Sequence, residues 1–319
     1  MRMSIAFGPV PSRRLGRSLG INNIPAKTCS YSCVYCQLGN TTRMQVERQT
    51  FYKPEHILGE VYEKVALAKS ERKQVDYLTF VSDGEPTLDA ALGKEIALLR
   101  PLGIKIALIS NASLIDREDV KDDLARTDLV SLKVDAVNEE AWRKVNRPHR
   151  FLKLDNILSG ILEFAKGFKG EIITETMLVA NVNDTPEEVK RIADFLSRLR
   201  PSKAYVAVPT RPPAETWVRP ASEWVVNMAY QTFSEALGKD RTEYLVGYEG
   251  NAFASTGNLQ ADLLSIVSVH PMREDAVREF LKKGNADWSV VTRLIQEGEL
   301  VELRYRRHRF YMRKLPSLD

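Results

Sequence analysis

The sequence has little that would cross-link the chain or hold it in a membrane. Its 319 residues include only three cysteines, and these are too few and too clustered for a disulfide framework. No uninterrupted apolar run approaches the roughly 18 residues that a membrane-spanning helix needs. The N-terminus also lacks the apolar core of a secretory signal. We therefore expect a cytoplasmic protein with no membrane partner.

Strong charge of either sign is also lacking. The net charge of +4 does not by itself predict a nucleic-acid partner, although basic residues gather near both ends of the chain. A hydrophobic fraction of 44% with 28% charged residues is ordinary for a globular protein, and the length suits one large domain or two.

The three cysteines form one motif, Cys29-x3-Cys33-x2-Cys36, with Tyr35 directly before the last of them. In a reducing compartment such a cluster more often binds metal or does redox chemistry than forms disulfides. Three thiolates from one loop can each bind one iron of a cubane and leave the fourth iron open. A structural zinc site normally has four protein ligands, so a zinc site completed by a remote histidine is the main alternative.

Up to about residue 240, short apolar runs alternate with amphipathic segments. Strands are expected over 18–23, 75–81, 104–110, 129–134, 171–179 and 203–208, and helices over 57–69, 90–99, 189–199 and 222–237. Strand and helix alternating about six times predict a parallel α/β sheet with crossover helices. The sheet is either open and doubly wound or curved into an incomplete barrel. In both, functional residues gather at the carboxyl ends of the strands.

Near residue 240 the pattern changes, which predicts one domain over residues 1–240 and a second over 241–319. After a loop at 246–258, three short helices are expected over 259–268, 273–283 and 289–297, then strands over 300–305 and 309–314. Three helices followed by a hairpin are typical of a winged-helix-like module. Basic and aromatic residues alternate from Arg304 to Lys314, which suits phosphate contact and base stacking. A nucleic acid, a protein partner and packing alone are the three interpretations.

With Tyr35 before its last cysteine, the motif resembles that of the radical S-adenosylmethionine (radical SAM) superfamily. The resemblance covers about residues 1–235 and implies an incomplete (β/α)6 TIM-like barrel. It implies a [4Fe–4S] cluster on Cys29, Cys33 and Cys36, with S-adenosylmethionine on the open iron. An electron donor such as flavodoxin or ferredoxin then allows release of a 5′-deoxyadenosyl radical, which abstracts hydrogen from a substrate.

The same resemblance implies further cofactor contacts. The segment from Asp83 to Thr87 corresponds to the family's Gly-Gly-Glu-Pro-Thr, with Asp83 in place of the first glycine. Gly84 and Glu85 would hold the methionine amino group, a cation that needs carboxylate or carbonyl acceptors. The complete set of expected cofactor contacts is Tyr35, Gly84, Glu85, Asn111, Lys133 and Asp135.

Three cationic residues are candidates for catalytic roles. Lys133 stands inside an apolar strand, so it faces either solvent or a pocket with an anionic partner, and we favour the pocket. Arg147 and Arg211 lie in proline-containing loops after the fourth and sixth strands, where arginine suits phosphate or carboxylate recognition. A solvated loop is an equal alternative for both. Glu175 and Asn181 are weaker candidates near the fifth strand.

Segments 7–16, 36–39 and 131–135 resemble a branch of this superfamily near the wyosine-base tRNA synthases. Those enzymes hold a second cluster on additional cysteines, which this chain lacks. We therefore expect the cofactor chemistry without their tRNA product, with hydrogen abstraction from RNA or a nucleotide-like anion. The arginines within 13–17 could also bind an anionic substrate. Two alternatives are a protein-modifying enzyme or activase that docks its partner through the C-terminal module, and an iron–sulfur redox sensor with a DNA-binding domain.

Overall fold

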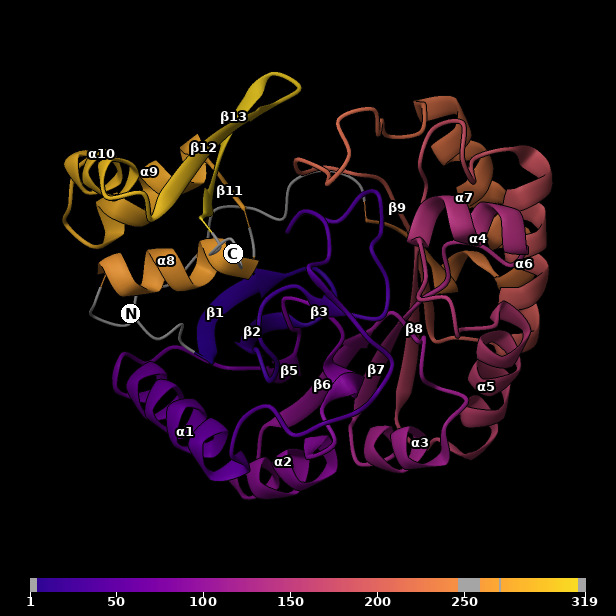
Figure 1. Ribbon diagram of the computed structural model, residues 1–319, viewed down its shortest axis with the longest axis horizontal. Coiled ribbons are helices and arrows are strands. Elements are labelled where there is room, and N and C mark those ends of the chain that lie inside the picture. The colour runs from indigo at the N-terminus through magenta and orange to yellow at the C-terminus, as the bar shows by residue number, and fades with distance from the viewer. Residues whose placement is uncertain (1–4, 246–258, 270, 315–319) are drawn as a thin grey trace.

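The main feature of the molecule is a curled eight-stranded sheet. The computed structural model describes residues 5–245, 259–269 and 271–314 (Figure 1). The strand order is β1-β2-β5-β6-β7-β8-β9-β10, with β1 antiparallel to β2 and every other pair parallel. The strands are β1 (Ala6–Ser12), β2 (Gly16–Ile21), β5 (Tyr77–Phe80), β6 (Lys105–Ser110), β7 (Leu129–Lys133), β8 (Glu171–Met177), β9 (Lys203–Ala207) and β10 (Thr242–Leu245). From β2 to β10 the strand order follows the chain without the reversal of a doubly wound sheet, and the edge strands β1 and β10 do not pair with each other. The expected incomplete TIM-like barrel is therefore confirmed, and the open doubly wound sheet was the wrong alternative.

The helices of the barrel part lie around the sheet, most of them on its convex side in Figure 1. They are α1 (Pro54–Ser70), α2 (Leu92–Leu99), α3 (Glu118–Leu124), α4 (Glu139–Asn146), α5 (Leu154–Gly167), α6 (Pro186–Leu199) and α7 (Glu223–Leu237), with short 3-10 turns η1 (Pro86–Leu88), η2 (Arg100–Leu102) and η3 (Lys239–Arg241). Helix α6 begins as its sequence predicts, because the Thr185 side chain accepts from the backbone N–H of Glu188 and Pro186 opens the helix. Among the described residues, no helix combines the length and apolarity that crossing a bilayer requires.

Apolar side chains fill both faces of the barrel strands. Leu78, Leu108 and Leu132 belong to the large cluster between the sheet and the helices. A smaller cluster on the other, concave face consists of Leu15, Ala107, Leu129, Ile173 and Tyr205. Because side chains alternate across a strand, Lys133 lies on the same concave face as Leu129. Burial on both faces also explains why these strands read as almost continuous apolar runs.

The C-terminal part contains a second small sheet with its own apolar cluster. Its elements are α8 (Leu259–Val269), β11 (Met272–Arg273), α9 (Glu274–Lys283), α10 (Ser289–Gln296), β12 (Leu300–Tyr305) and β13 (His308–Arg313), with β13 central in the sheet. The three helices and the strands β12 and β13 lie where the sequence predicts them, whereas β11 was not predicted and includes Arg273, the expected first residue of a helix. Their classification as a winged-helix-like module, and a domain boundary at residue 240, stay predictions. The expected loop over 246–258 lies outside the described residues.

Two strands at the edges of the barrel sheet are absent from the sequence prediction. Strand β1 contains Gly8, Pro9 and Pro11, which are typical of a loop, and an edge strand is where a sheet tolerates proline. Strand β10 has four residues and pairs with β9, so the barrel sheet continues beyond residue 240. Periodicity could not identify either strand, because short edge strands carry too few alternating residues.

Candidate active site

The cysteine loop follows β2 at the carboxyl edge of the sheet. Cys29 ends the short strand β3 (Thr28–Cys29), which pairs with β4 (Arg43–Met44) and so closes the loop on itself. All three cysteines are half-buried. Three N–H groups point at their sulfur atoms: Tyr31 N and Asn111 Nδ2 lie 3.5 Å from Cys29 Sγ, and Asn146 Nδ2 lies 3.4 Å from Cys33 Sγ. Such donors stabilise thiolate sulfur.

The donor set fits a cubane better than a single ion. Within the described residues, no three His, Cys, Asp or Glu side chains converge on one point, as a zinc ion would require. In a cubane each thiolate binds its own iron, so the sulfur atoms stand apart. Burial raises the pKa of all three thiols, that of Cys33 to about 12, and the nearby carboxylates of Glu85 and Asp135 add to the rise at Cys29 and Cys33. Metal binding must therefore displace thiol protons, and the positive charge of iron favours this.

The turn after β5 packs directly under the cysteine loop. A Cβ built on Gly84 would lie 1.8 Å from the carbonyl oxygen of Thr28, so only glycine allows this approach. The backbone N–H of Glu85 donates to the same oxygen at 3.2 Å. Gly84 therefore serves the close contact between the two loops, and its contact with a cofactor stays a prediction.

The Glu85 carboxylate is buried and joins the ends of two strands. It accepts from Thr87 N at 3.1 Å and Thr87 Oγ1 at 2.6 Å within its own turn. It also accepts from Ser110 Oγ at 2.8 Å and from Asn111 N at 2.7 Å, at the end of β6. Three of these donors reach Oε1 and, among the described residues, only Asn111 N reaches Oε2, so Oε2 keeps an acceptor position. Glu85 thus fixes the backbone of Asn111, whose side chain reaches Cys29.

Asp83, the departure from the family pattern, is also buried. Its Oδ2 accepts from Asn22 Nδ2 at 2.9 Å, and its backbone N–H donates to Asn22 Oδ1 at 3.1 Å. Its Oδ1 has no hydrogen-bond partner among the described residues, and burial raises the pKa of the side chain to about 7. Asp83 therefore places a buried carboxyl oxygen near the cysteine loop, where the family has a glycine without a side chain.

A chain of polar contacts runs from Cys33 into the barrel. Asn146 Nδ2 donates to both Cys33 Sγ and Asp135 Oδ2, the latter at 2.8 Å. The Tyr35 hydroxyl donates to the same Asp135 oxygen. Lys133 Nζ lies 5.5 Å from the centre of the Tyr35 ring and forms an ion pair with Glu175. The expected residues Tyr35, Lys133 and Asp135 therefore lie together, although their cofactor and catalytic roles stay predictions.

The other two catalytic candidates lie on mouth loops. Arg147 follows α4 in a left-handed conformation, with φ at 44°, and forms an ion pair with Glu215 on the loop after β9. Arg211 Nη1 donates to Gln37 Oε1 at 3.1 Å, directly beside the cysteine motif. Arg211 is thus close to the cluster loop, whereas Arg147 bridges two loops at the surface. Asn181 lies on an exposed turn, where its backbone N–H donates to Asp184.

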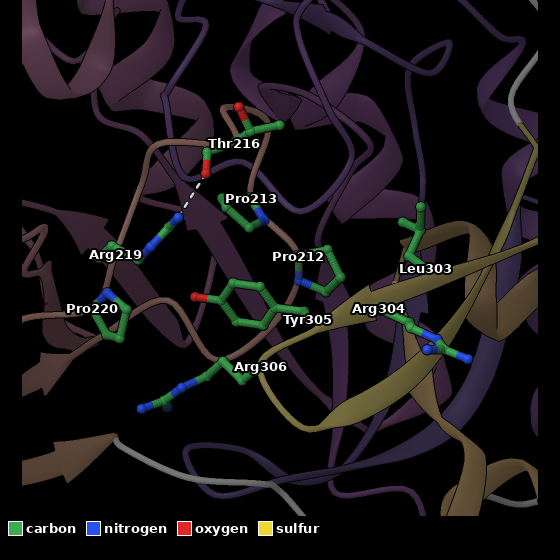
Figure 2. Close-up of a pocket in the computed structure, with 9 residues that line it drawn as sticks. All are labelled: Pro212, Pro213, Thr216, Arg219, Pro220, Leu303, Arg304, Tyr305 and Arg306. Atoms are coloured by element: carbon green, nitrogen blue, oxygen red, sulfur yellow. Dashed lines mark hydrogen bonds between the residues drawn. The ribbon is translucent and has the colours of Figure 1, made fainter.

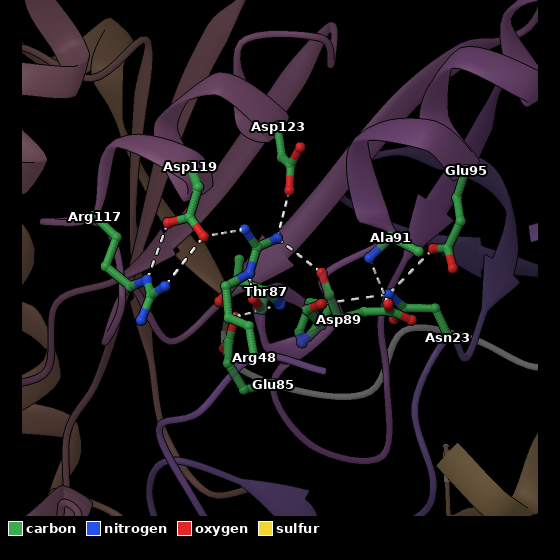
Figure 3. A network of polar contacts seen from close by, with 11 residues as sticks. Asn23, Arg48, Glu85, Thr87, Asp89, Ala91, Glu95, Arg117, Asp119 and Asp123 are labelled. Carbon is green, nitrogen blue, oxygen red and sulfur yellow. Dashed lines mark hydrogen bonds and ion pairs between the residues drawn. The ribbon is translucent and has the colours of Figure 1, made fainter. Parts of the chain in front are cut away.

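Arg48 is a site residue that the sequence does not reveal (Figure 3). Its guanidinium donates to the carbonyl oxygens of Thr87 at 2.9 Å and Asp89 at 2.7 Å. It also pairs with Asp119 at 2.8 Å and with Asp123. The side chain is only 5% exposed and holds the turn after Glu85 against α3. No local motif marks Arg48, because its partners lie 39 to 75 residues away.

Glu95 and Asp89 form a buried acidic pair next to this network (Figure 3). Burial and the neighbouring Asp89 raise the pKa of Glu95 to about 9, and burial raises that of Asp89 to about 6. Protonated Glu95 can then donate to Asp89 while Asn23 Nδ2 donates to Glu95 Oε2 at 3.3 Å. In the unfolded chain a glutamate titrates near pH 4.3. The native state therefore binds more protons between roughly pH 4.3 and 9, and the free energy of unfolding falls as pH rises through this range.

We expect Glu95→Gln to reduce this pH dependence, because glutamine keeps a donor and never ionises. Its free energy of unfolding should equal that of wild type near pH 5 and exceed it at pH 9, with a slope difference of up to about 1.4 kcal/mol per pH unit. Chemical denaturation at pH 5, 7 and 9 measures this. Glu63→Gln on the exposed face of α1 is the control and should leave the slope unchanged. Equal slopes for wild type and Glu95→Gln would show that Glu95 is ionised in the native state.

A groove separates the loop after β9 from the hairpin of β12 and β13 (Figure 2). Two adjoining cavities of about 730 and 870 Å³ share Pro220, Tyr305 and Arg306, and we call them together the hairpin groove. The first is also lined by Pro212, Pro213, Thr216, Arg219, Leu303 and Arg304, and the second includes Arg273, Arg307 and His308. The Tyr305 hydroxyl donates to the carbonyl oxygen of Pro209 at 3.1 Å, which fastens the hairpin to the barrel.

Only part of the basic hairpin faces this groove. Arg306 occupies the turn with φ at 56°, a conformation that a hairpin turn usually fills with glycine or asparagine. Arg309, by contrast, lies within 3.7 Å of Glu274 and 3.8 Å of Glu302, and Arg313 lies 3.4 Å from Glu299. The alternation of basic and aromatic residues in the sequence does not show which arginines line the groove and which lie against acidic residues of the same module.

Comparison with known proteins gives consistent matches. The model of the radical SAM superfamily matches residues 23–196. The "UPF0026 protein" of Methanocaldococcus jannaschii is 48% identical over 99% of this chain and 98% of its own length. A probable dual-specificity RNA methyltransferase RlmN of Trichodesmium erythraeum is 27% identical over 63% of this chain and 59% of its own length. The structure of TYW1 with a lysine–pyruvate adduct bound is 16% identical, with a TM-score of 0.53 over 69% of this chain and 73% of that one, and is similar in fold.

Proposed function

Because the chain belongs to the radical SAM superfamily, it is a radical SAM enzyme, and we propose that its substrate is RNA. Superfamily members use a [4Fe–4S] cluster and S-adenosylmethionine. We assign the cluster to Cys29, Cys33 and Cys36, whose half-buried thiols and N–H donors fit it. When bound, the cluster would supply the electron for reductive cleavage of S-adenosylmethionine. Superfamily enzymes need a reductant, and a flavodoxin or ferredoxin in that role stays a prediction.

The residues around the cysteines would then position the cofactor. Glu85 fixes the backbone of Asn111, whose side chain donates to Cys29, and Asn146 donates to both Cys33 and Asp135. Asp135 in turn accepts from the Tyr35 hydroxyl, which fixes the aromatic ring between the cysteine loop and Lys133. We propose that this cradle holds S-adenosylmethionine at the carboxyl edge of the barrel, where parallel α/β folds bind their ligands.

The hairpin groove is the observation that carries the choice of RNA. Arg219, Arg304, Arg306 and Arg307 line it, and within the described residues neither Arg306 nor Arg307 is part of an ion pair. Two exposed tryptophans adjoin its walls in the sequence: Trp217 is 48% exposed and Trp224 is 68% exposed. Arginines that follow a phosphate backbone beside aromatic rings that stack on bases are the usual features of a single-strand binding surface. The name of the RNA methyltransferase relative is consistent with this choice.

RNA binding tests the proposal directly. Wild-type protein should bind unfractionated tRNA more weakly as salt rises, as phosphate contacts require. The double variant Arg306→Ala with Arg307→Ala should weaken binding about tenfold or more and reduce the salt slope by about two. Arg309→Ala is the matched control from the same hairpin, because Arg309 already lies against Glu274 and Glu302, and it should bind as wild type does.

The outcomes separate the alternatives. No tRNA binding at low salt, or equal binding by the double variant and wild type, would contradict an RNA substrate and favour a protein partner at the hairpin. Binding to double-stranded DNA that changes with cluster oxidation, without formation of 5′-deoxyadenosine, would indicate a redox sensor instead.

A further inference from the structure

Two oppositely charged side chains are neighbours on the concave face of the barrel. Lys133 in β7 is the register partner of Glu175 in β8, and the two form an ion pair. Each lies on the same face of its strand as a member of the concave apolar cluster, Leu129 for Lys133 and Ile173 for Glu175. The pair therefore lies inside the barrel, and Lys133 also approaches the Tyr35 ring of the cysteine loop.

A second cation reaches Glu175 from the opposite end of the barrel. The turn between β1 and β2 places Leu15 against Leu129 and Ile173, at the starts of the parallel strands. The preceding residue, Arg14, pairs with Glu175 through Nη1. Its Nε is buried and has no hydrogen-bond partner among the described residues. The Nε–H group of Arg14 has therefore lost its contact with water and gains no hydrogen bond from the described residues in return.

Three cations act on the Glu175 carboxylate. Burial acts to raise the pKa of Glu175, but Lys133, Arg14 and Arg211 together hold it at about 2, so this carboxylate is ionised. Asp135 is the other acid near Lys133, and it already accepts from Tyr35, Asn146 and the backbone N–H of Met177. Arg14 and Lys133 therefore share the Glu175 carboxylate as their counter-ion.

The exposed fractions of these side chains also favour a binding site. The side chains of Arg14 and Lys133 retain 14% and 21% exposure, whereas Glu175 retains 6%. The cations are within reach of a bound molecule, while the carboxylate that holds them is covered.

We propose that Arg14, Lys133 and Arg211 form an oxyanion site inside the barrel, which binds a phosphate or carboxylate group of the substrate. Glu175 is the internal counter-ion that keeps Arg14 and Lys133 in place when the site is empty and competes with the incoming anion. The assignment rests on the proposed function, in that it takes the concave face beside the cysteine loop as the place where the substrate reacts.

Titration calorimetry on the cluster-reconstituted protein tests the site with two probes, inorganic phosphate and succinate, at matched ionic strength. We expect saturable binding of at least one probe. Arg14→Gln and Lys133→Met should each weaken it about tenfold or more, as loss of a charged hydrogen bond requires. Glu175→Gln should tighten it about tenfold, because the competing carboxylate is gone. A purely structural ion pair would not predict that opposite sign. Arg191→Gln, which removes an exposed cation on α6, is the control and should leave affinity unchanged.

Preference for phosphate or for succinate identifies the group that the site takes. Absence of saturable binding for both probes, or equal affinity in Glu175→Gln and wild type, overturns the inference. Displacement of the probe by S-adenosylmethionine also overturns it, because the cations would then hold the cofactor's own carboxylate. The tRNA-binding measurement tests the RNA substrate separately. Absence of probe binding with intact tRNA binding contradicts the oxyanion site alone. Intact probe binding without tRNA binding contradicts only the RNA substrate.

Discussion

Replacing Cys33 by alanine is expected to leave the protein without a stable [4Fe–4S] cluster and to reduce formation of 5′-deoxyadenosine to background. The chain has three cysteines in all, so no spare thiol can take the place of a lost ligand. Two protein ligands would leave two irons of the cubane open, and open irons lose their cluster readily. Cys33 also lies at the start of the polar chain through Asn146 and Asp135, so its loss should disturb the cofactor cradle as well.

Iron and sulfide per chain after anaerobic reconstitution give the first readout, and 5′-deoxyadenosine after addition of dithionite and S-adenosylmethionine gives the second. Met44→Ala is the matched control, since it removes an exposed sulfur-containing side chain from the strand β4 that closes the same loop. That variant should keep both the cluster and the activity. Equal iron content and equal product in Cys33→Ala and wild type would contradict the cysteine assignment.

Local sequence predicts the parts of the site that adjoin one another in the chain. The cysteine motif, the glycine–glutamate turn and the polar ends of β6 and β7 all lie at the carboxyl edge of the sheet, where the alternation of strands and helices places them. The cap at Thr185 also marks the start of α6 in both sequence and structure. These features depend on hydrogen bonds and backbone preferences within a few residues, so the sequence alone contains the information.

Contacts between distant segments could not be predicted in this way. Arg14 and Glu175 are 161 residues apart, and Arg48 and Asp123 are 75 residues apart. Nothing in the sequence near either arginine indicates which carboxylate it will meet. Lys133 shows the limit clearly: because both faces of a barrel strand are covered, an apolar run does not say which face a single charged residue occupies. The pairing of Lys133 with its register partner on β8 places it on the concave face.

Gly84→Ala is expected to be as damaging to the cluster as loss of a cysteine, although Gly84 carries no chemistry of its own. The new Cβ would lie 1.8 Å from the Thr28 carbonyl oxygen, a backbone atom that cannot rotate away. Relief of this clash must move either the Glu85 turn or β3, whose last residue is Cys29. Overpacking of this kind typically costs about 1–3 kcal/mol, and here the displaced backbone is the one that positions a cluster ligand.

Gly59→Ala is the matched control, and this same glycine-to-alanine change is expected to stabilise the protein. Gly59 lies on the exposed side of α1, and a Cβ there meets no atom within 4 Å. Alanine should therefore stabilise the helix by about 1 kcal/mol, because glycine is the poorer helix former. The iron content per chain and the midpoint of thermal unfolding, measured for both variants, test these two expectations. We expect Gly84→Ala to lose most of its iron while Gly59→Ala keeps it and unfolds at a higher temperature. Equal iron in the two would show that the turn after β5 does not support Cys29, and that the cysteine loop holds its cluster without the contact between Gly84 and Thr28.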